Sequence, residues 1–422
     1  MAEPRTYFIE TLGCPKNQVD SDKLEGTLIA DGMTPAAYAD EADLIVVNTC
    51  AFIEEARQES IHTILSLHEE RADEAKLVVT GCMAERYGQE LAEAMPEADA
   101  VAGFGVPVTL GTKPKAAPSL DLLHLPRPAS AAPWAYVKIA EGCDRNCGFC
   151  AIPTFRGPQR SRTIEDICAE VDALGAREIV LIAQDLASFG RDQGQGEKSI
   201  VPLVEAVSQR VPWVRLLYLY PSDLNEALID AICATGVPYF DLSLQHVSPP
   251  LMRRMRRWGN GTRFLERIET IRSREPEAAF RSNFIVGYPG ETEDDHDRLI
   301  EFVEAARLDW CGFFAYSPED GTYATTLDGE VDPELVNERL AELREIQDLI
   351  TEEKRDEMLG RRVQVLVDEV GVARSHREAP EIDGIIEVPE SLPVGEFADV
   401  VITEAAGPEL RAELPDGDGT TR

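Results

Sequence analysis

Short apolar runs alternate with longer amphipathic stretches along the first hundred residues. The apolar runs lie at residues 6–12, 43–48 and 76–80 and are strand-like, whereas residues 21–30 and 54–68 have helical spacing. Alternation of this kind predicts a small parallel α/β sheet. We therefore expect residues 4–104 to form a first domain.

A proline-rich stretch separates this region from a second, longer series of apolar runs. Residues 105–128 contain five prolines, which exclude a continuous helix or central strand and predict a linker. Strand-like runs then recur at residues 134–140, 178–184, 214–220, 239–245, 280–287 and 311–316, with helical stretches such as 163–174, 223–234, 262–274 and 292–306 between them. Six βα units predict that residues 129–357 form a partial (β/α)6 barrel, with its site at the C-terminal face of the strands.

The last part of the chain changes pattern again. A long charged helix at about residues 333–359 leads into short strand-like pieces, including residues 384–388 and 398–403, which predict a small β-barrel over residues 358–422. The fold class is therefore α/β, with a small barrel at its C-terminal end. This barrel has six Arg, no Lys and fourteen acidic residues, a net charge of −8 that disfavours binding of RNA.

Composition indicates a multidomain protein of a reducing compartment. At 422 residues the chain is too long for one ordinary core, and its 44% apolar content is sufficient for two or three. It has no N-terminal secretion signal and no run of 18 apolar residues, so we expect no membrane association. Its nine Cys then favour metal or redox chemistry over disulfides, and the cytoplasm as location.

The net charge narrows the choice of partners. Its value of −36 arises from 77 acidic and 41 basic residues, and such a surface repels polyanions and attracts basic proteins. Nucleic acid is therefore disfavoured as the main substrate. A charge that serves solubility alone is the alternative.

Three cysteines lie within a span of eight residues, shortly after the first strand of the predicted barrel. Cys143, Cys147 and Cys150 supply three thiolates from one loop, and no fourth Cys follows before Cys168. A ferredoxin-type cluster takes four Cys ligands, so three would leave one iron of a 4Fe-4S cluster open. The alternative, a structural zinc site, normally needs a second pair of Cys or His, and the sequence offers no second CxxC or HxxxH pair.

Three further cysteines each follow a strand of the first domain. Because the carboxyl ends of parallel strands meet at one edge of a sheet, we expect Cys14, Cys50 and Cys82 to come together there. Their convergence favours a second cluster. The alternative is that they are small apolar residues that fill the core.

Polar residues and glycines follow several strands of the predicted barrel. Those expected to form a rim suited to a nucleoside such as S-adenosylmethionine (SAM) are Phe149, Gln184, Gln245, Gly287, Pro289 and Glu291. Three positions at this rim also have a simpler interpretation. Asp185 could cap a helix, His246 could be an ordinary surface residue, and Pro289-Gly290 could form a simple turn.

Arginines gather in two short segments of the predicted barrel. One holds Arg156, Arg160 and Arg162, and the other holds Arg253, Arg254, Arg256 and Arg257. The second segment is either a solvated helix face or a fork that binds a carboxylate of SAM or of the substrate.

The CxxxCxxC loop, with Phe149 before its third Cys, resembles that of the radical SAM superfamily. Nearly the whole chain is similar to the methylthiotransferase family within it. The motifs concerned are Thr-Leu-Gly-Cys14-Pro-Lys-Asn-Gln, Asn48-Thr-Cys50, Thr80-Gly-Cys82-Met-Ala and Ile285-Val-Gly-Tyr-Pro-Gly-Glu-Thr292. This resemblance implies two 4Fe-4S clusters, one on each group of three Cys, and SAM at the open iron of the barrel cluster. The last domain resembles the TRAM module.

One branch of this family modifies an adenosine of transfer RNA, and another modifies an aspartate of the small-subunit ribosomal protein number twelve. The chain resembles the second branch at Leu219-Tyr-Pro221-Ser-Asp, Phe314-Ala-Tyr-Ser-Pro-Glu-Asp-Gly-Thr322 and Ala379-Pro-Glu-Ile-Asp-Gly384. It departs mildly from the family pattern at Ser243 and at Ser282-Asn283.

The resemblance implies that the chain inserts a methylthio group at the β-carbon of that aspartate. It further implies that one SAM is the radical source, a second SAM is the methyl donor, and a flavodoxin or ferredoxin is the electron donor. No catalytic residue beyond the cluster ligands is specified. Methylthiolation of transfer RNA and a non-catalytic iron–sulfur or zinc protein are the alternatives.

Overall fold

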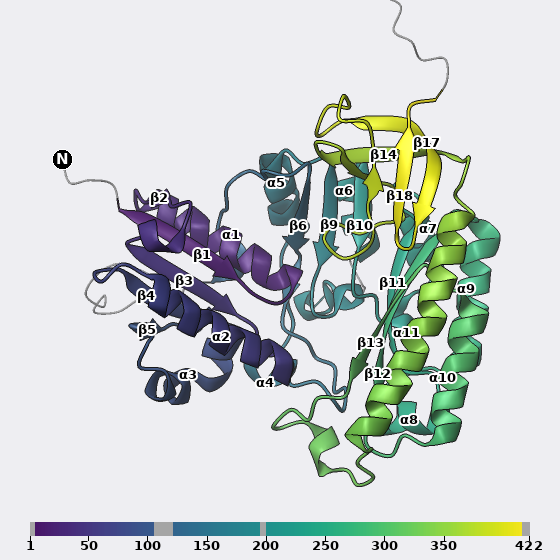
Figure 1. The fold of residues 1–422 in the computed structure, drawn as a ribbon, viewed down its shortest axis with the longest axis horizontal. Helices are drawn as coiled ribbons and strands as arrows, with labels where there is room; N and C mark the ends of the chain where they lie inside the picture. The colour runs from purple at the N-terminus through teal and green to yellow at the C-terminus, as the bar shows by residue number, and fades with distance from the viewer. Residues whose placement is uncertain (1–4, 105–120, 195–199, 416–422) are drawn as a thin grey trace, which may run out of the picture.

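The computed structural model describes residues 5–104, 121–194 and 200–415, which fold into three regions in chain order (Figure 1). The first region is a five-stranded sheet of order β2-β1-β3-β4-β5, in which every neighbouring pair is parallel. Its strands are β1 (Thr6–Thr11), β2 (Thr34–Pro35), β3 (Leu44–Thr49), β4 (Lys76–Gly81) and β5 (Ala100–Val101). The parallel α/β sheet predicted from the sequence is therefore confirmed.

Helices cover both faces of this sheet. Helix α1 (Pro15–Ala30) packs on one face, and α2 (Glu54–Glu70) and α3 (Cys82–Ala94) pack on the other. Helix α1 begins six residues before the predicted start because Pro15 occupies its first position, where a missing N–H costs nothing. The central strand β3 is consequently buried along its whole length.

The second region is a six-stranded partial barrel, as predicted. It consists of two parallel three-stranded sheets, β10-β9-β6 and β11-β12-β13, joined by a single bridge between Leu219 and Leu242. The strands are β6 (Trp134–Lys138), β9 (Glu178–Ile182), β10 (Trp213–Leu216), β11 (Tyr239–Gln245), β12 (Ala279–Val286) and β13 (Trp310–Ala315). Strand β10 ends earlier than predicted because Tyr218 adopts the left-handed conformation, with φ of 66°.

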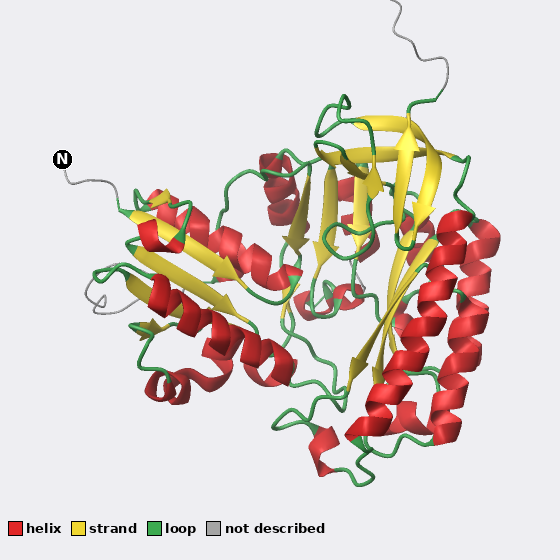
Figure 2. Cartoon of the chain, viewed as in Figure 1, coloured by secondary structure: helices red, strands yellow, loops and turns green. Residues whose placement is uncertain are grey.

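Helices cover the outside of the barrel (Figure 2). They are α5 (Ile164–Leu174), α6 (Ile200–Ser208), α7 (Glu226–Cys233), α9 (Gly261–Arg274), α10 (Glu293–Ala306) and α11 (Pro333–Asp356), with the short helices α4 (Ile152–Phe155) and α8 (Pro249–Arg254) near the cysteine loop. The short strands β7 (Ala140–Glu141) and β8 (Arg160–Ser161) pair with each other next to that loop. No helix in the described parts of the chain has both the length and the apolar composition that crossing a bilayer requires.

The predicted linker lies partly outside the described residues. Its described part includes a single 3-10 turn at Leu122–His124. The Lys23 ammonium of α1 donates a hydrogen bond of 2.7 Å to the Leu123 carbonyl. Residues 121–128 thus lie against the first region.

The third region is a closed barrel of five strands, coloured yellow in Figure 1. Its strands are β14 (Arg362–Glu369), β15 (Val372–Arg374), β16 (Ile386–Glu387), β17 (Phe397–Ala406) and β18 (Glu409–Glu413). The small β-barrel predicted at the C-terminal end is confirmed.

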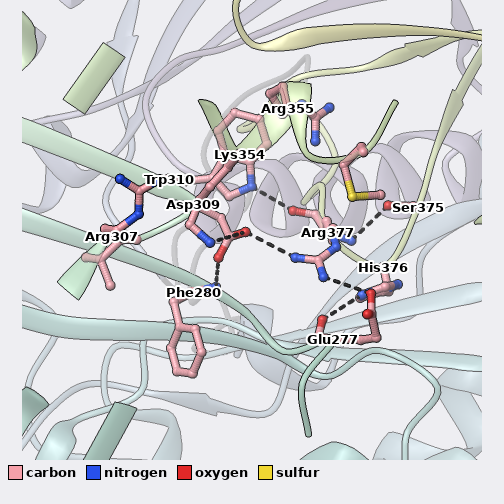
Figure 3. Close-up of polar contacts among 12 residues, drawn as sticks. Glu277, Phe280, Arg307, Asp309, Trp310, Lys354, Arg355, Ser375, His376 and Arg377 are labelled. Atoms are coloured by element: carbon pink, nitrogen blue, oxygen red, sulfur yellow. Dashed lines mark hydrogen bonds and ion pairs between the residues drawn. The ribbon is translucent and has the colours of Figure 1, made fainter. Parts of the chain in front are cut away.

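One segment of this small barrel, residues 374–383, packs on the beginnings of the large barrel's strands. Arg374 forms an ion pair of 2.9 Å with Glu178, the first residue of β9. Arg377 binds Asp309 at 3.1 Å and Glu277 at 2.9 Å (Figure 3). The small barrel therefore closes the N-terminal end of the large one and leaves its C-terminal end for the site.

Candidate active site

The three N-terminal cysteines lie at one edge of the first sheet. Cys14 caps α1 after β1, Cys50 follows β3, and Cys82 begins α3 after β4. Strands β1, β3 and β4 are parallel neighbours, so their carboxyl ends are adjacent. A Cβ atom added to Gly13 would lie 2.7 Å from Cβ and 2.8 Å from Sγ of Cys50, so only glycine permits this approach.

Asn17, in the first turn of α1, holds the strand ends together. Its amide nitrogen donates to the carbonyl of Leu12 at 2.8 Å and to that of Thr49 at 3.0 Å. Its amide oxygen lies 3.5 Å from Sγ of Cys82. One buried side chain thus fixes the geometry of all three strand ends.

The barrel cysteines occupy the loop that follows β7. The Cys143 N–H donates to the Gly157 carbonyl at 3.0 Å, and the Gly148 N–H donates to the Met255 carbonyl at 2.8 Å. The backbone N–H of Arg145 points at the Cys143 sulfur, at 3.4 Å. The loop is therefore anchored to the barrel on two sides.

Burial raises the pKa of thiols in both groups. Burial raises the pKa of Cys50 to about 12, and the nearby Cys82 and Cys14 contribute to the rise. Burial likewise raises the pKa of Cys150 to about 12, with contributions from Cys147 and Cys143. Because iron binds the thiolate, loading of either group must release protons.

A guanidinium contacts one sulfur in each group. Arg156 lies 3.0 Å from Sγ of Cys82, and Arg257 lies 3.3 Å from Sγ of Cys147. Thiolates are the ligands of iron–sulfur clusters, and hydrogen bonds to their sulfurs help to set the reduction potential. Among the described residues, no three His, Cys, Asp or Glu side chains are spaced to hold a single metal ion.

Arg156 also belongs to a buried group of charges between the first domain and the barrel. It binds Glu141 at 2.9 Å, and Lys138 binds the same carboxylate at 2.7 Å and also pairs with Asp20. Burial alone would raise the pKa of Glu141, but Arg156 and Lys138 hold it well below its usual range. These charges connect the loop before Cys143 to the cysteines of the first domain.

Two tyrosines after β10 connect the two cysteine groups. The ring of Tyr218 lies 3.3 Å from the ammonium of Lys16, two residues beyond Cys14. The ring of Tyr220 lies under Arg257, at 4.2 Å, and under Arg145, at 4.0 Å. The segment 218–220 therefore runs from one cysteine group to the other.

Among the predicted SAM contacts, Gly287, Pro289 and Glu291 belong to one tight loop. The Glu291 carboxylate accepts from the Gly287 N–H at 2.5 Å and pairs with Arg339 at 3.0 Å. A Cβ atom on Gly287 would lie 2.5 Å from a methyl group of Val336, and the Pro289 carbonyl accepts from Arg254 at 3.0 Å. All three residues therefore shape this loop, and their contact with SAM stays a prediction.

The other three lie nearer to the cysteine loop. Gln184 donates to Glu141 at 2.7 Å. Gln245 ends β11 in the left-handed conformation, with φ of 73°, and Phe149 packs on a cluster that includes Tyr288. Phe149 belongs to the cysteine loop itself, and Gln184 contacts Glu141, two residues before Cys143; contact of all three residues with SAM also stays a prediction.

The neighbouring residues differ from the simpler alternatives. His246 is fully buried rather than on the surface, its Nδ1 accepts from the Ser248 N–H, and burial lowers its pKa to about 4. The Asp185 side chain does not cap a helix but binds Arg145 of the cysteine loop at 2.6 Å.

The arginines of the second segment are divided between several partners. Arg254 binds Asp328, Arg256 stacks on Tyr323 and Arg257 reaches Cys147. Sequence reasoning missed the contacts of Arg156 and Arg257 with sulfur and the position of Lys16. Lys16 and Arg156 lie within a few residues of a Cys motif, whereas Arg257 is 107 residues beyond Cys150 and has no such signal.

Comparison with known proteins agrees with this three-part architecture. The model of Uncharacterized protein family UPF0004 matches residues 6–103, that of the radical SAM superfamily matches residues 137–303, and that of the TRAM domain matches residues 359–414. Relatives named ribosomal protein uS12 methylthiotransferase RimO include those of Kineococcus radiotolerans, 40% identical over 97% of each chain, and Cutibacterium acnes, 38% identical over 96% of this chain and 97% of that one. The relative of Moorella thermoacetica is 41% identical over 93% of this chain and 95% of its own. The chain therefore belongs to the RimO family of radical SAM methylthiotransferases.

Proposed function

We propose that this protein inserts a methylthio group at the β-carbon of an aspartate side chain of ribosomal protein uS12. The observation that supports it best is that Tyr218 contacts Lys16, two residues beyond Cys14, while Tyr220 contacts Arg257, which reaches the sulfur of Cys147. Sulfur insertion needs a site that generates a radical and a site that supplies sulfur, both within reach of one substrate carbon.

Each cysteine group is proposed to bind one 4Fe-4S cluster. Cys143, Cys147 and Cys150 would hold the first, and Cys14, Cys50 and Cys82 the second. When bound, these clusters supply the electron that cleaves SAM and the iron site from which the sulfur is delivered. Phe149, Gln184, Gln245, Gly287, Pro289 and Glu291 are proposed to surround SAM.

The domain boundaries proposed for this activity are those of the sequence pattern. They give an N-terminal domain at residues 4–104, a linker at 105–128, a barrel at 129–357 and a TRAM-like barrel at 358–422. A flavodoxin or ferredoxin as electron donor and a cytoplasmic location are consistent with this chemistry. The net charge of −36 favours a basic ribosomal protein over transfer RNA as substrate.

Mass spectrometry of uS12 after anaerobic incubation with the reconstituted protein, SAM, sulfide and a reductant tests the proposal. We expect a mass increase of one methylthio group on one aspartate. Replacement of Cys143 by Ala should abolish SAM cleavage and product, whereas Cys50→Ala should abolish sulfur insertion and leave some SAM cleavage. Methylthiolation by Cys50→Ala at the wild-type rate would contradict the two-cluster assignment.

Cys168→Ala is the matched control, because Cys168 is a buried cysteine of α5 that belongs to neither group. It should retain about eight irons per chain, the content of two clusters. Purified protein with zinc alone would favour a non-catalytic role. Methylthio groups on the nucleosides of transfer RNA, with none on uS12, would favour the other branch of the family.

A further inference from the structure

Between the two cysteine groups lies an ammonium that forms no ion pair with a carboxylate of the described residues. Lys16 is the second residue of α1, and its ammonium lies over the Tyr218 ring. Within the described residues, the Lys16 ammonium has neither a hydrogen bond nor an ion pair. The Tyr218 ring holds it in place without neutralising its charge.

The guanidinium groups near the two cysteine groups already have acceptors within the protein. Arg156 binds Glu141 at 2.9 Å, and Arg145 binds Asp185 at 2.6 Å. Arg257 donates to the carbonyl of Ser243 and to the sulfur of Cys147. Each guanidinium is thus engaged by the protein itself.

Asp241 is the carboxylate of this region with which Lys16 would be expected to form an ion pair. It accepts instead from the Tyr218 N–H, at 2.9 Å, and makes no ion pair with Lys16. Tyr218 adopts its left-handed conformation, with φ of 66°, at this point of the chain. A residue other than glycine is strained in this conformation. The contacts of Tyr218 with Lys16 and Asp241 must offset the free-energy cost of that strain.

A carboxylate substrate needs such a cation because the rest of the protein repels it. The net charge of −36 steers a basic protein toward the surface but opposes entry of an acidic side chain. The Lys16 ammonium, which has no hydrogen bond within the described residues, would give such a carboxylate a positive charge to bind. It can also fix the carboxylate by charge-assisted hydrogen bonds, which are the strong ones.

We propose that the Lys16 ammonium binds the side-chain carboxylate of the substrate aspartate and so positions the adjacent β-carbon between the two cysteine groups. This inference rests on the proposed function. It makes Lys16 the residue that distinguishes aspartate from asparagine at the modified position. Asparagine has the same shape but presents no charge to the ammonium.

Equilibrium binding of uS12 and of uS12 with its modified Asp replaced by Asn tests this inference. The wild-type protein should bind the Asp form about tenfold to a hundredfold more tightly, as a hydrogen bond between charged groups predicts. Lys16→Met should bind both forms with equal affinity. Lys16→Arg, which retains the charge, should keep most of the preference for Asp.

Lys76→Met is the matched control, because Lys76 lies at the opposite end of β4 from Cys82 and is exposed. It should discriminate as the wild type does. Binding is also measured on cluster-free chains, so that loss of a cluster in Lys16→Met cannot account for the result. Equal discrimination by Lys16→Met and the wild type overturns the inference, as does a wild type that does not discriminate.

Failure of the proposed function would be seen separately, as the absence of methylthiolated uS12 with the wild-type protein. A different role for Lys16, as a counter-ion for the second cluster, predicts another pattern. In that case Lys16→Met would shift the reduction potential of that cluster and preserve the preference for Asp. That pattern too would overturn the inference.

Discussion

A single arginine links the chemistry of the two domains. Arg156 directly follows α4. Its guanidinium contacts Glu141 of the barrel and also Asn17 and Cys82 of the first domain. A planar guanidinium can serve these three acceptors at once, whereas an ammonium has no such fork. The residue therefore orients the domains and places a positive donor on a sulfur.

Replacement of Arg156 by Lys should lower the reduction potential of the second cluster. Hydrogen bonds to sulfur stabilise the reduced form, and the loss of one charge-assisted bond corresponds to a shift on the order of 50 mV or more. A redox titration followed by electron paramagnetic resonance measures it. Arg160→Lys, which changes an exposed arginine paired with Asp121, is the control and should leave the potential unchanged. An unshifted potential in Arg156→Lys would show that the contact does not influence the cluster.

His246 should make stability depend on pH between about 6.5 and 4. Burial lowers its pKa to about 4 from an ordinary 6.5, so the unfolded chain binds the extra proton in this window and the folded chain does not. The stabilisation is complete above pH 6.5 and decreases as the pH falls. The free energy of unfolding should decrease by about 2 kcal/mol between pH 7 and pH 5 on this account. Urea unfolding at both values measures it, and His246→Asn, which lacks the titrating ring, should lose about that much of the dependence.

At the scale of elements, the turns after the strands of the first domain bring the cysteines together. Each of the turns after β1 and β4 uses a glycine with positive φ, Gly13 at 95° and Gly81 at 90°. Gly13 touches Cys50, and a Cβ atom on Gly81 would lie 2.3 Å from the Asn48 side chain. These glycines allow the neighbouring strand end to approach, and the strand order then determines which cysteines meet.

Replacement of Gly13 by Ala should remove the second cluster. The added methyl group collides with Cys50, so we expect about four irons fewer per chain, while the signal of the barrel cluster persists. Gly32→Ala is a matched control, because Gly32 also has positive φ, 84°, but no atom lies within 4 Å of the added Cβ. It has a similar backbone strain and should keep both clusters. Iron analysis and electron paramagnetic resonance distinguish the two variants, and full iron content in Gly13→Ala would be the contrary outcome.

The elements that sequence predicts best are those whose pattern is local. The strand endings near Cys14, Cys50 and Cys82 follow from apolar runs, and parallel order then brings the ends together. The early end of β10 was not predictable, because the left-handed Tyr218 lies inside an apolar run. The contact between Arg156 and Cys82 joins residues 74 positions apart, and no local pattern encodes such a pairing.

At the scale of the whole molecule, buried ion pairs join the two barrels. Glu178 is fully buried; it accepts a hydrogen bond from Arg215 of β10 at 2.7 Å and forms an ion pair of 2.9 Å with Arg374 of the small barrel. Arg355 of α11 pairs with the buried Glu378 of the small barrel. Separation of the barrels would break the ion pairs of Glu178 with Arg374 and of Glu378 with Arg355.

Replacement of Glu178 by Gln should therefore destabilise both barrels together. It leaves Arg215 and Arg374 without the carboxylate they share, and removal of one partner from a buried ion pair costs about 3–5 kcal/mol. Glu387→Gln is the control, because Glu387 pairs with Arg411 at the surface, where such pairs contribute about 1 kcal/mol or less. Hydrogen exchange should show protection falling by the same free energy in β9 and β14 of Glu178→Gln. If β14 alone lost protection, the small barrel would unfold as an independent unit. Segment 374–383 would then not stabilise the N-terminal end of the large barrel.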